Sequence, residues 1–194
     1  MAALTLLIIR HAEKPGGDWP GPGLDLNGVG DIKSLVIRGW QRAGAWSVLF
    51  GDRLGGADYP KPDVIYAADP ASTPDAAGAE NGGPSKRPFE TVTPLAAKLG
   101  LTPVVKWAQG QEAQLVAEAA SLSGVVLIAW EHKKIISSIL PTIAQGANLG
   151  IPTDWPSQRF DVVLRFDRAG HDHPWTFQQL FPKLMSGDSD TPLP

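Results

Sequence analysis

Two histidines in this chain each follow an apolar run, and a charged residue precedes each of them. Arg10 comes directly before His11, and Glu131 comes directly before His132. A further charged residue, Arg87, stands where a helical pattern begins. Helix N-termini favour anions through their free N–H groups and the helix dipole. We therefore expect the two histidines and two arginines to converge on an anion, at a place where chemistry is done.

Two buried strands are the elements that must bring these residues together. The run Leu4–Ile9 is too short for a helix and rich in β-formers, and Gly124–Trp130 is strongly apolar. Such runs are typical of strands buried on both faces. In open α/β sheets ligands bind at the carboxyl ends of the strands. His11 and His132 therefore belong to the same predicted edge.

The rest of the chain alternates between strand and helix patterns, which predicts a three-layer α/β/α sandwich with a mostly parallel sheet and a C-terminal hairpin. Residues 1–185 are expected to form a single domain, and 186–194 a loose tail. Other expected elements are a helical stretch with apolar residues from 32 to 43, strands at 63–68 and 102–106, helices at 89–99, 112–120 and 134–144, a long loop at 69–84, and a hairpin of 160–168 with 175–181.

Composition excludes several classes of protein. The 194 residues are 43% hydrophobic, enough for one core, and contain no cysteine, which excludes disulfides, thiolate metal sites and cysteine nucleophiles. A formal net charge of −3 argues against a nucleic-acid partner. The first apolar run is short and lacks a basic flank, and no run is long enough for a membrane span, so we expect a cytoplasmic protein without a membrane partner.

The order of the motifs resembles that of a known family. Residues 7–15, Leu-Ile-Ile-Arg-His-Ala-Glu-Lys-Pro, resemble the Arg-His-Gly signature of the histidine phosphatase superfamily, which includes the cofactor-dependent phosphoglycerate mutases. Asn27-Gly28 followed by Gln41-Arg42-Ala43 resembles the stretch of the family's first helix, residues 87–91 resemble its second-arginine motif, and 125–132 resemble the strand with the second histidine. The resemblance extends from Leu4 to about Ile143.

This resemblance implies a phosphoglycerate mutase-like fold and a phosphomonoester hydrolase that works through a phosphohistidine, without a metal or cofactor. His11 would attack phosphorus, and Arg10, Arg87 and His132 would surround the transferring oxygens. The substrate would be a small phosphorylated metabolite or a phosphorylated protein side chain. A mutase of the same family remains an alternative, because the sequence does not distinguish the two reactions.

The sequence departs from the family pattern beside both histidines. Ala12 replaces the glycine of Arg-His-Gly, and Glu131 stands where glycine usually precedes the second histidine. Glu131 is therefore the first candidate for the acid/base, with an ion pair to Lys134 or Arg87 as the other interpretation. The further candidates for this proton donor are Glu13, Glu90 and Glu112.

Two residues just after His11 are also expected to bind substrate. Lys14 resembles the extra basic residue of some family branches, and Glu13 lies close behind the nucleophile, although both also fit salt-bridging loop positions.

Two other functions stay open. A non-catalytic phosphate-binding protein would fit the negative charge of Glu131, which repels a dianion. A metallohydrolase would use His171 and His173, whose spacing can chelate a metal, although a hairpin turn is the simpler interpretation.

Overall fold

The computed structural model describes residues 2–52, 54–71 and 85–194, and these contain one five-stranded sheet in the order β2-β3-β1-β4-β5. Strands β1, β2 and β3 run parallel, β4 is antiparallel to β1, and β5 is antiparallel to β4. The predicted mostly parallel sheet with a C-terminal hairpin is confirmed. The strands are β1 Leu4–Arg10, β2 Val64–Ala67, β3 Gly124–Trp130, β4 Val163–Arg168 and β5 Thr176–Leu180.

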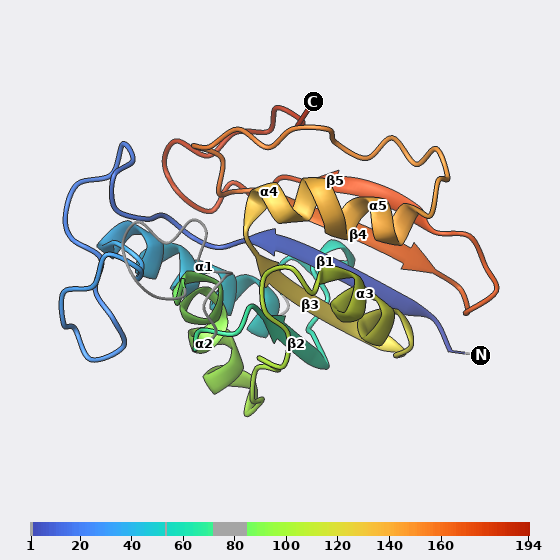
Figure 1. The fold of residues 1–194 in the computed structure, drawn as a ribbon, viewed down its shortest axis with the longest axis horizontal. Helices are drawn as coiled ribbons and strands as arrows, with labels where there is room; N and C mark the ends of the chain where they lie inside the picture. Colours follow the sequence, from blue (N-terminus) through green and yellow to red (C-terminus); the bar gives the residue numbers. More distant parts are fainter. Residues whose placement is uncertain (1, 53, 72–84) are drawn as a thin grey trace.

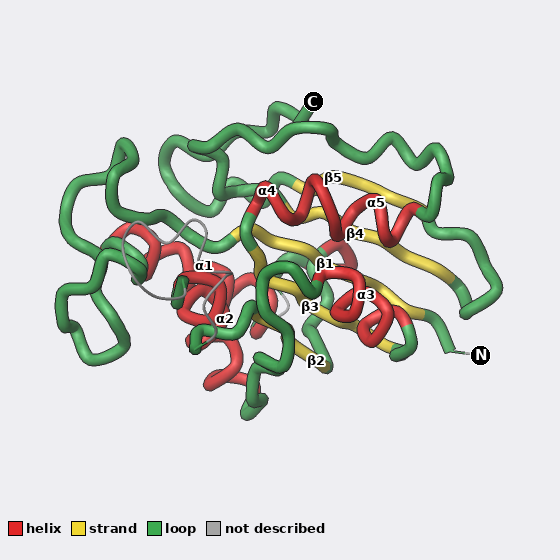
Figure 2. The backbone as a smooth tube through the Cα atoms, in the orientation of Figure 1, coloured by secondary structure: helices red, strands yellow, loops and turns green. Residues whose placement is uncertain are grey.

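The pairing of β1 with β3 places the two histidine motifs side by side. The register runs from Leu4 opposite Gly124 to Arg10 opposite Trp130, and the His11 N–H donates to the Trp130 carbonyl at 3.0 Å. The segments that follow β1 and β3 both leave the sheet directly after this last pair. The long loop after β1 then extends beyond this edge of the sheet (blue in Figure 1, green in Figure 2).

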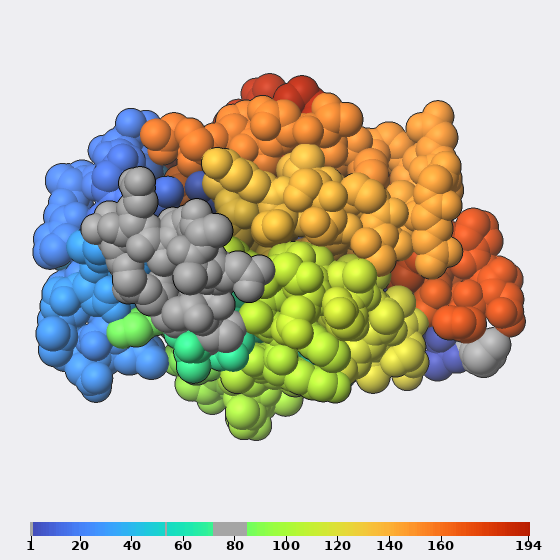
Figure 3. All heavy atoms as spheres, in the orientation of Figure 1, coloured from blue at the N-terminus to red at the C-terminus, as the bar shows by residue number. Residues whose placement is uncertain are grey.

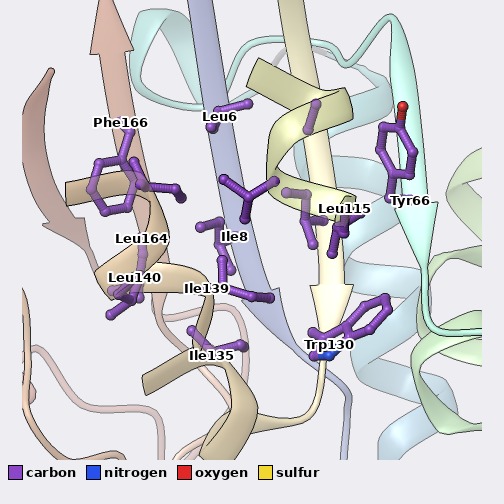
Figure 4. Packing of buried hydrophobic residues seen from close by; sticks show 14 of the residues in the cluster. Leu6, Ile8, Tyr66, Leu115, Trp130, Ile135, Ile139, Leu140, Leu164 and Phe166 are labelled. Atoms are coloured by element: carbon purple, nitrogen blue, oxygen red, sulfur yellow. The ribbon is translucent and has the colours of Figure 1, made fainter. Parts of the chain in front are cut away.

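Helices cover both faces of the sheet. Successive side chains of β1 point to opposite faces, and each face forms its own apolar cluster with the helices on that side. Leu7 and Ile9 pack with residues of α1 and α2, whereas Leu6 and Ile8 pack with residues of α3 and of the helix after β3 (Figure 4). The predicted three-layer sandwich is thus confirmed. The helices are α1 Ile37–Gly51, α2 Arg87–Leu99, α3 Glu112–Ala120, and a continuous segment made of α4 His132–Lys134, the π-helical η2 Ile135–Ile139 and α5 Leu140–Ala144; a short 3-10 turn, η1, spans Gly56–Asp58.

None of the helices in the described part of the chain has the length and hydropathy needed to cross a membrane.

Two of the expected elements differ from the structure, and a third falls largely outside the described residues. The first helix begins only at Ile37; the preceding residues form a loop in which Leu35 is buried and Ile32 is 60% exposed. Strand 102–106 reduces to a single bridge between Val104 and Tyr66, in which the Val104 N–H donates to the Ile65 carbonyl and the Val104 carbonyl accepts from the Ala67 N–H. Most of the expected 69–84 loop, residues 72–84, lies outside the described residues.

The last residues correct the expectation of a loose tail. Leu193 is buried and its N–H donates to the Gln179 side chain at 2.8 Å, while the Thr153 N–H donates to the Pro194 carbonyl at 2.7 Å. The C-terminal residues, dark red in Figure 3, lie against the segment that precedes β4. Specific hydrogen bonds therefore join this segment to the domain.

Helix α1 approaches the loop after His11 so closely that only glycine fits at one position. A Cβ on Gly39 would lie 2.5 Å from the Glu13 carbonyl oxygen, whereas a Cβ on Gly44 of the same helix would meet nothing within 4 Å. We predict that Gly39→Ala lowers the free energy of unfolding by about 1–3 kcal/mol through overpacking. Gly44→Ala should raise it by up to about 1 kcal/mol through helix propensity. Urea unfolding of both variants measures the difference, and equal effects would contradict the close approach.

Candidate active site

His11, the first residue after β1, is held as a neutral imidazole. Its side chain is buried, and Nδ1 lies 2.8 Å from the Ala12 carbonyl oxygen. Because a carbonyl only accepts, Nδ1 carries the proton and Nε2 keeps a free electron pair. Burial, and then the positive charge of Arg10, hold the pKa of His11 well below its usual 6.5. The geometry therefore presents an unprotonated ring nitrogen at the sheet edge.

Arg10 is a buried cation with unused hydrogen-bond donors. Its Nη1 donates to the carbonyls of Ser157 and Arg159 at 2.8 and 2.9 Å, and more weakly to that of Pro156 at 3.3 Å. The guanidinium carbon lies 3.9 Å from the centroid of the Phe160 ring. Within the described residues, Nε and Nη2 are buried without a partner. Burial lowers the pKa of Arg10 to about 10, so the group stays charged at neutral pH and can donate two hydrogen bonds to an anion.

Arg87 enters the site from the N-terminus of α2. Its Nε donates to the Ser34 carbonyl at 3.4 Å, and Nη2 donates to the Ile32 carbonyl. Thr91, one turn later, donates from Oγ1 to the Arg87 carbonyl at 2.7 Å and accepts the Ala12 N–H at 2.9 Å. This hydroxyl links the start of α2 to the end of β1.

Glu131 and His132 form a close pair at the start of α4. Glu131 Oε1 lies 2.8 Å from His132 Nδ1, within ion-pair distance, although the angle lies outside hydrogen-bond geometry. Oε2 accepts the Lys134 N–H at 3.0 Å and so caps the helix. Burial would raise the pKa of Glu131, but His132 and the N–H groups of Lys133 and Lys134 hold it at about 2. The carboxylate is thus ionised at neutral pH and has no proton to give to a leaving group.

Positive charge dominates the surroundings of His11. Lys14 is partly buried, and its pKa is lowered by burial and by the charges of Arg87, Arg10 and Lys133, with Glu131 opposing them. Charges that repel one another in this way are relieved when an anion binds between them. The site is therefore suited to a multiply charged anion.

Two cavities are lined by residues of this region and have Ser157 in common. One, of about 350 Å³, is lined by His132, Lys133, Ile136 and Trp155 as well as Ser157. The other, of about 160 Å³, lies beside Lys14. Of the candidate site residues, His132 therefore lines the first of these cavities and Lys14 lines the second.

Three solved structures share the fold of this chain over nearly its whole length. A mycobacterial glucosyl-3-phosphoglycerate phosphatase matches with a TM-score of 0.51 at 14% sequence identity, covering 92% of this chain and 98% of its own. The protein histidine phosphatase SixA, complexed with tungstate, matches at 0.50 and 14% identity, covering 92% and 97%. Phosphoglycerate mutase from Plasmodium falciparum matches at 0.51 and 12% identity, covering 100% of both chains. No protein-family model and no curated protein sequence matches the chain.

The fold is that of the histidine phosphatases and phosphoglycerate mutases. The fold expected from the Arg-His motif is thereby confirmed. On this histidine phosphatase fold, the structure brings Arg10, His11 and Glu131 within electrostatic reach of one another at the carboxyl edge of the sheet, together with Arg87. His132 comes directly after Glu131 at that edge.

The other three carboxyl candidates are occupied by internal partners. Glu13 is fully buried, with its Oε1 2.8 Å from Arg42 Nη2. Glu90 accepts from the Ser34 hydroxyl at 2.6 Å and from the Leu35 N–H at 2.9 Å, and burial raises its pKa. Glu112 accepts from the Trp130 indole N–H at 3.0 Å. The structure therefore assigns Glu13 to an ion pair in the interior rather than to substrate.

The histidines of the C-terminal hairpin lie away from this site. His171 and His173 line a cavity of about 480 Å³ with Arg168 and Trp175, where the turn between β4 and β5 meets the ends of α3 and α5. Within residues 2–52, 54–71 and 85–194, no three His, Asp or Glu side chains are grouped so that they could hold a metal ion.

Sequence reasoning missed the residues that hold Arg10 in place. The carbonyls of Ser157 and Arg159 bind its guanidinium, and Phe160 lies under it. Backbone acceptors leave no trace in residue identity, and a lone Phe in a loop has no distinguishing pattern. Thr91 was visible within the second-arginine motif, although its role as a link to Ala12 was not.

The environment of His11 generates a prediction about its titration. We expect the NMR signals of the His11 ring to keep the positions of a neutral imidazole from pH 8 down to pH 6, because burial and Arg10 depress its pKa. The signals are assigned by their loss in His11→Gln. Because the unfolded chain binds this proton more readily, the free energy of unfolding should also fall as the pH drops below about 6.5, and should fall less in His11→Gln. A midpoint at or above 6.5 would contradict the assigned environment.

Proposed function

We propose that this protein is a member of the histidine phosphatase superfamily that hydrolyses phosphomonoesters through a phosphohistidine on His11. The observation that carries the proposal is the pairing of a neutral imidazole, whose Nδ1–H donates to the Ala12 carbonyl, with a buried guanidinium that has two nitrogens without a partner among the described residues. An imidazole alone is a common buried group. Within reach of the charge of Arg10, Nε2 of this imidazole would act as a nucleophile next to a site for phosphate oxygens.

In the first step the phosphoryl group moves to His11. Nε2 attacks phosphorus, the bond from phosphorus to the ester oxygen breaks, and that oxygen leaves and takes up a proton from solvent water. Arg10 and Arg87 neutralise charge on the phosphoryl oxygens, and each such cation about 4 Å from a unit charge contributes roughly 4 kcal/mol at an effective dielectric of 20. Only the part of this interaction that grows in the transition state accelerates the reaction.

In the second step water hydrolyses the phosphohistidine. A new bond forms between the water oxygen and phosphorus, the bond to Nε2 breaks, and phosphate leaves while His11 returns to its neutral form. Glu131, ionised beside His132, is suited to orient that ring and to accept a proton from the attacking water. Its low pKa disfavours the other half of the acid/base role, proton donation to the leaving group.

The substrate class is a small phosphorylated metabolite or a phosphorylated protein side chain. Two of the matching structures are named as a sugar-phosphoglycerate phosphatase and a protein histidine phosphatase, which supports either kind of phosphate ester or phosphoramidate. Lys14 adds a cation beside the second cavity, where it would contact the phosphate or an anionic group next to it.

Replacement of the nucleophile tests the proposal directly. We expect His11→Ala to lower the turnover of an aryl phosphate by at least about 10³-fold, because the covalent route is lost. His171→Ala, which removes an exposed imidazole of the hairpin turn, should retain the activity of the intact protein. Rapid quench with a 32P-labelled aryl phosphate should trap an acid-labile, alkali-stable phosphoprotein in the intact chain and in His171→Ala only.

Other results of the quench, of a phosphate-binding assay or of chelation would each indicate a different function. Labelled phosphate on a rearranged product instead of in free phosphate would indicate a mutase. Binding of phosphate without turnover of any aryl phosphate would indicate a phosphate-binding protein. Loss of activity on chelation, with His11→Ala fully active, would indicate a metal-dependent reaction elsewhere.

The partly buried lysine generates a prediction about substrate affinity. Lys14→Ala should raise KM for an aryl phosphate by about fivefold with kcat nearly unchanged, since one cation near a dianion is worth on the order of 1 kcal/mol when partly exposed. The effect should shrink as the salt concentration rises. Lys61→Ala, an exposed lysine in the loop before β2, is the matched control and should leave KM unchanged. A loss confined to kcat would assign Lys14 to the chemical step instead.

A further inference from the structure

Three residues near the C-terminus, Asp188, Ser189 and Thr191, are bonded to two separate parts of the candidate site and are here called the C-terminal clasp. Asp188 binds Arg42 of helix α1, whereas Ser189 and Thr191 bind the side chain of Arg159 in the segment before β4. The side chain of Asp188 is only 3% exposed. A terminal segment that needed only to cover the surface would not require a buried carboxylate.

The first connection leads from the clasp to His11. Asp188 holds the guanidinium of Arg42 with two hydrogen bonds, of 2.8 and 3.1 Å. The same guanidinium binds the carboxylate of Glu13 through Nη2 at 2.8 Å and Nε at 3.0 Å. Glu13 shares a peptide group with Ala12, and the carbonyl of that peptide accepts the Nδ1–H of His11. Anchoring Glu13 therefore fixes the carbonyl that sets the tautomer and orientation of the nucleophile.

The second connection leads from the clasp to Arg10. Arg159 donates from Nη1 to the Thr191 carbonyl at 2.8 Å and from Nη2 to the Ser189 carbonyl at 3.3 Å. Asp161 bridges the same pieces, since it accepts from Arg159 Nε at 2.8 Å and from the Ser189 N–H at 2.6 Å. The main-chain carbonyl of Arg159 in turn accepts from Arg10 Nη1. The clasp thus holds the residue whose carbonyl orients the anion-binding guanidinium.

We propose that the C-terminal clasp positions the reacting groups, and that Asp188 is a positioning residue for phosphoryl transfer to His11. It contacts neither substrate nor nucleophile, and acts through Arg42 and Glu13. The rate of transfer depends steeply on such alignment, because small displacements of a reacting group cost large factors in rate. This inference rests on the proposed function, and it extends the site to a residue 177 positions away from the nucleophile in sequence.

The chain offers a matched pair of variants for the test. Asp188→Asn keeps the size of the side chain but removes the charge that holds Arg42. Asp190→Asn makes the same change two residues later, at a side chain that is 69% exposed and pairs only with Lys183 among the described residues. We expect Asp188→Asn to slow the rate of phosphohistidine formation by tenfold to about 100-fold at a temperature well below its Tm, with the affinity for inorganic phosphate changed far less. Asp190→Asn should match the unmodified protein in both measurements.

A second readout does not depend on turnover. Long-range 1H–15N NMR of the His11 ring reports which nitrogen carries the proton. Asp188→Asn should reduce the Nδ1–H form of His11 or shift its signals, while Asp190→Asn should leave them in place. If the unmodified protein forms no phosphohistidine, the proposed function fails, whereas this NMR comparison still decides whether the clasp orients His11.

The results that overturn the inference are equally specific. An Asp188→Asn variant with a lower Tm, but with an unchanged rate of phosphohistidine formation and unchanged His11 signals, would assign Asp188 to stability alone. Should this variant fail to fold, Asp188→Glu retains the charge and moves the carboxylate by one methylene. It should show a smaller loss of rate with a perturbed His11 signal, and unchanged values of both would overturn the inference as well.

Discussion

The burial of one cation at the edge of the sheet is the constraint on which the rest of the site depends. Arg10 is fully buried, yet one of its terminal nitrogens takes up the main-chain acceptors offered by residues 156–159, and the other two guanidinium nitrogens have no partner within the described residues. A buried donor without a partner costs about 1–3 kcal/mol. The protein tolerates this cost because the guanidinium lies against Phe160 and is fixed by three carbonyls. Burial, and then the same charge, lower the pKa of the neighbouring His11, so one cation both offers donors to an anion and favours the neutral imidazole beside it.

Residue order along the chain was sufficient to predict the sheet and the two histidine motifs at its edge. Apolar runs such as Leu4–Ile9 specify buried strands, and parallel strands bring the residues at their carboxyl ends to a common edge. Similar reasoning failed at the start of α1, where the buried residues Leu35 and Val36 belong to a loop. Apolar spacing records which side chains are buried, but it does not distinguish a helix from a loop that packs on the same core.

The fate of each carboxylate could not be predicted from local sequence, because it depends on partners that are distant along the chain. Glu13 is next to the Arg10-His11 motif, but Arg42 and Arg38 neutralise it in the interior. Glu131 is adjacent to His132 and caps a helix, and these contacts lower its pKa so that it stays ionised. The composition of the tail predicts a loose segment, but Asp188, Leu193 and Pro194 each join it to the domain through specific contacts. Composition averages over the residues of a segment, so it does not show whether one charged side chain finds a buried partner elsewhere in the chain.

The pairing of β1 with β3 has a consequence for how such a chain can change in evolution. Arg10 stands opposite Trp130 in an unbroken ladder that begins at Leu4 and Gly124. Deleting a single residue inside either strand would turn every later side chain of that strand to the opposite face and send one histidine away from the other. Loops that join the strands carry no such restriction. Insertions and deletions should therefore accumulate between the strands while strand lengths stay constant, which allows this architecture to persist when only 12–14% of residues are shared.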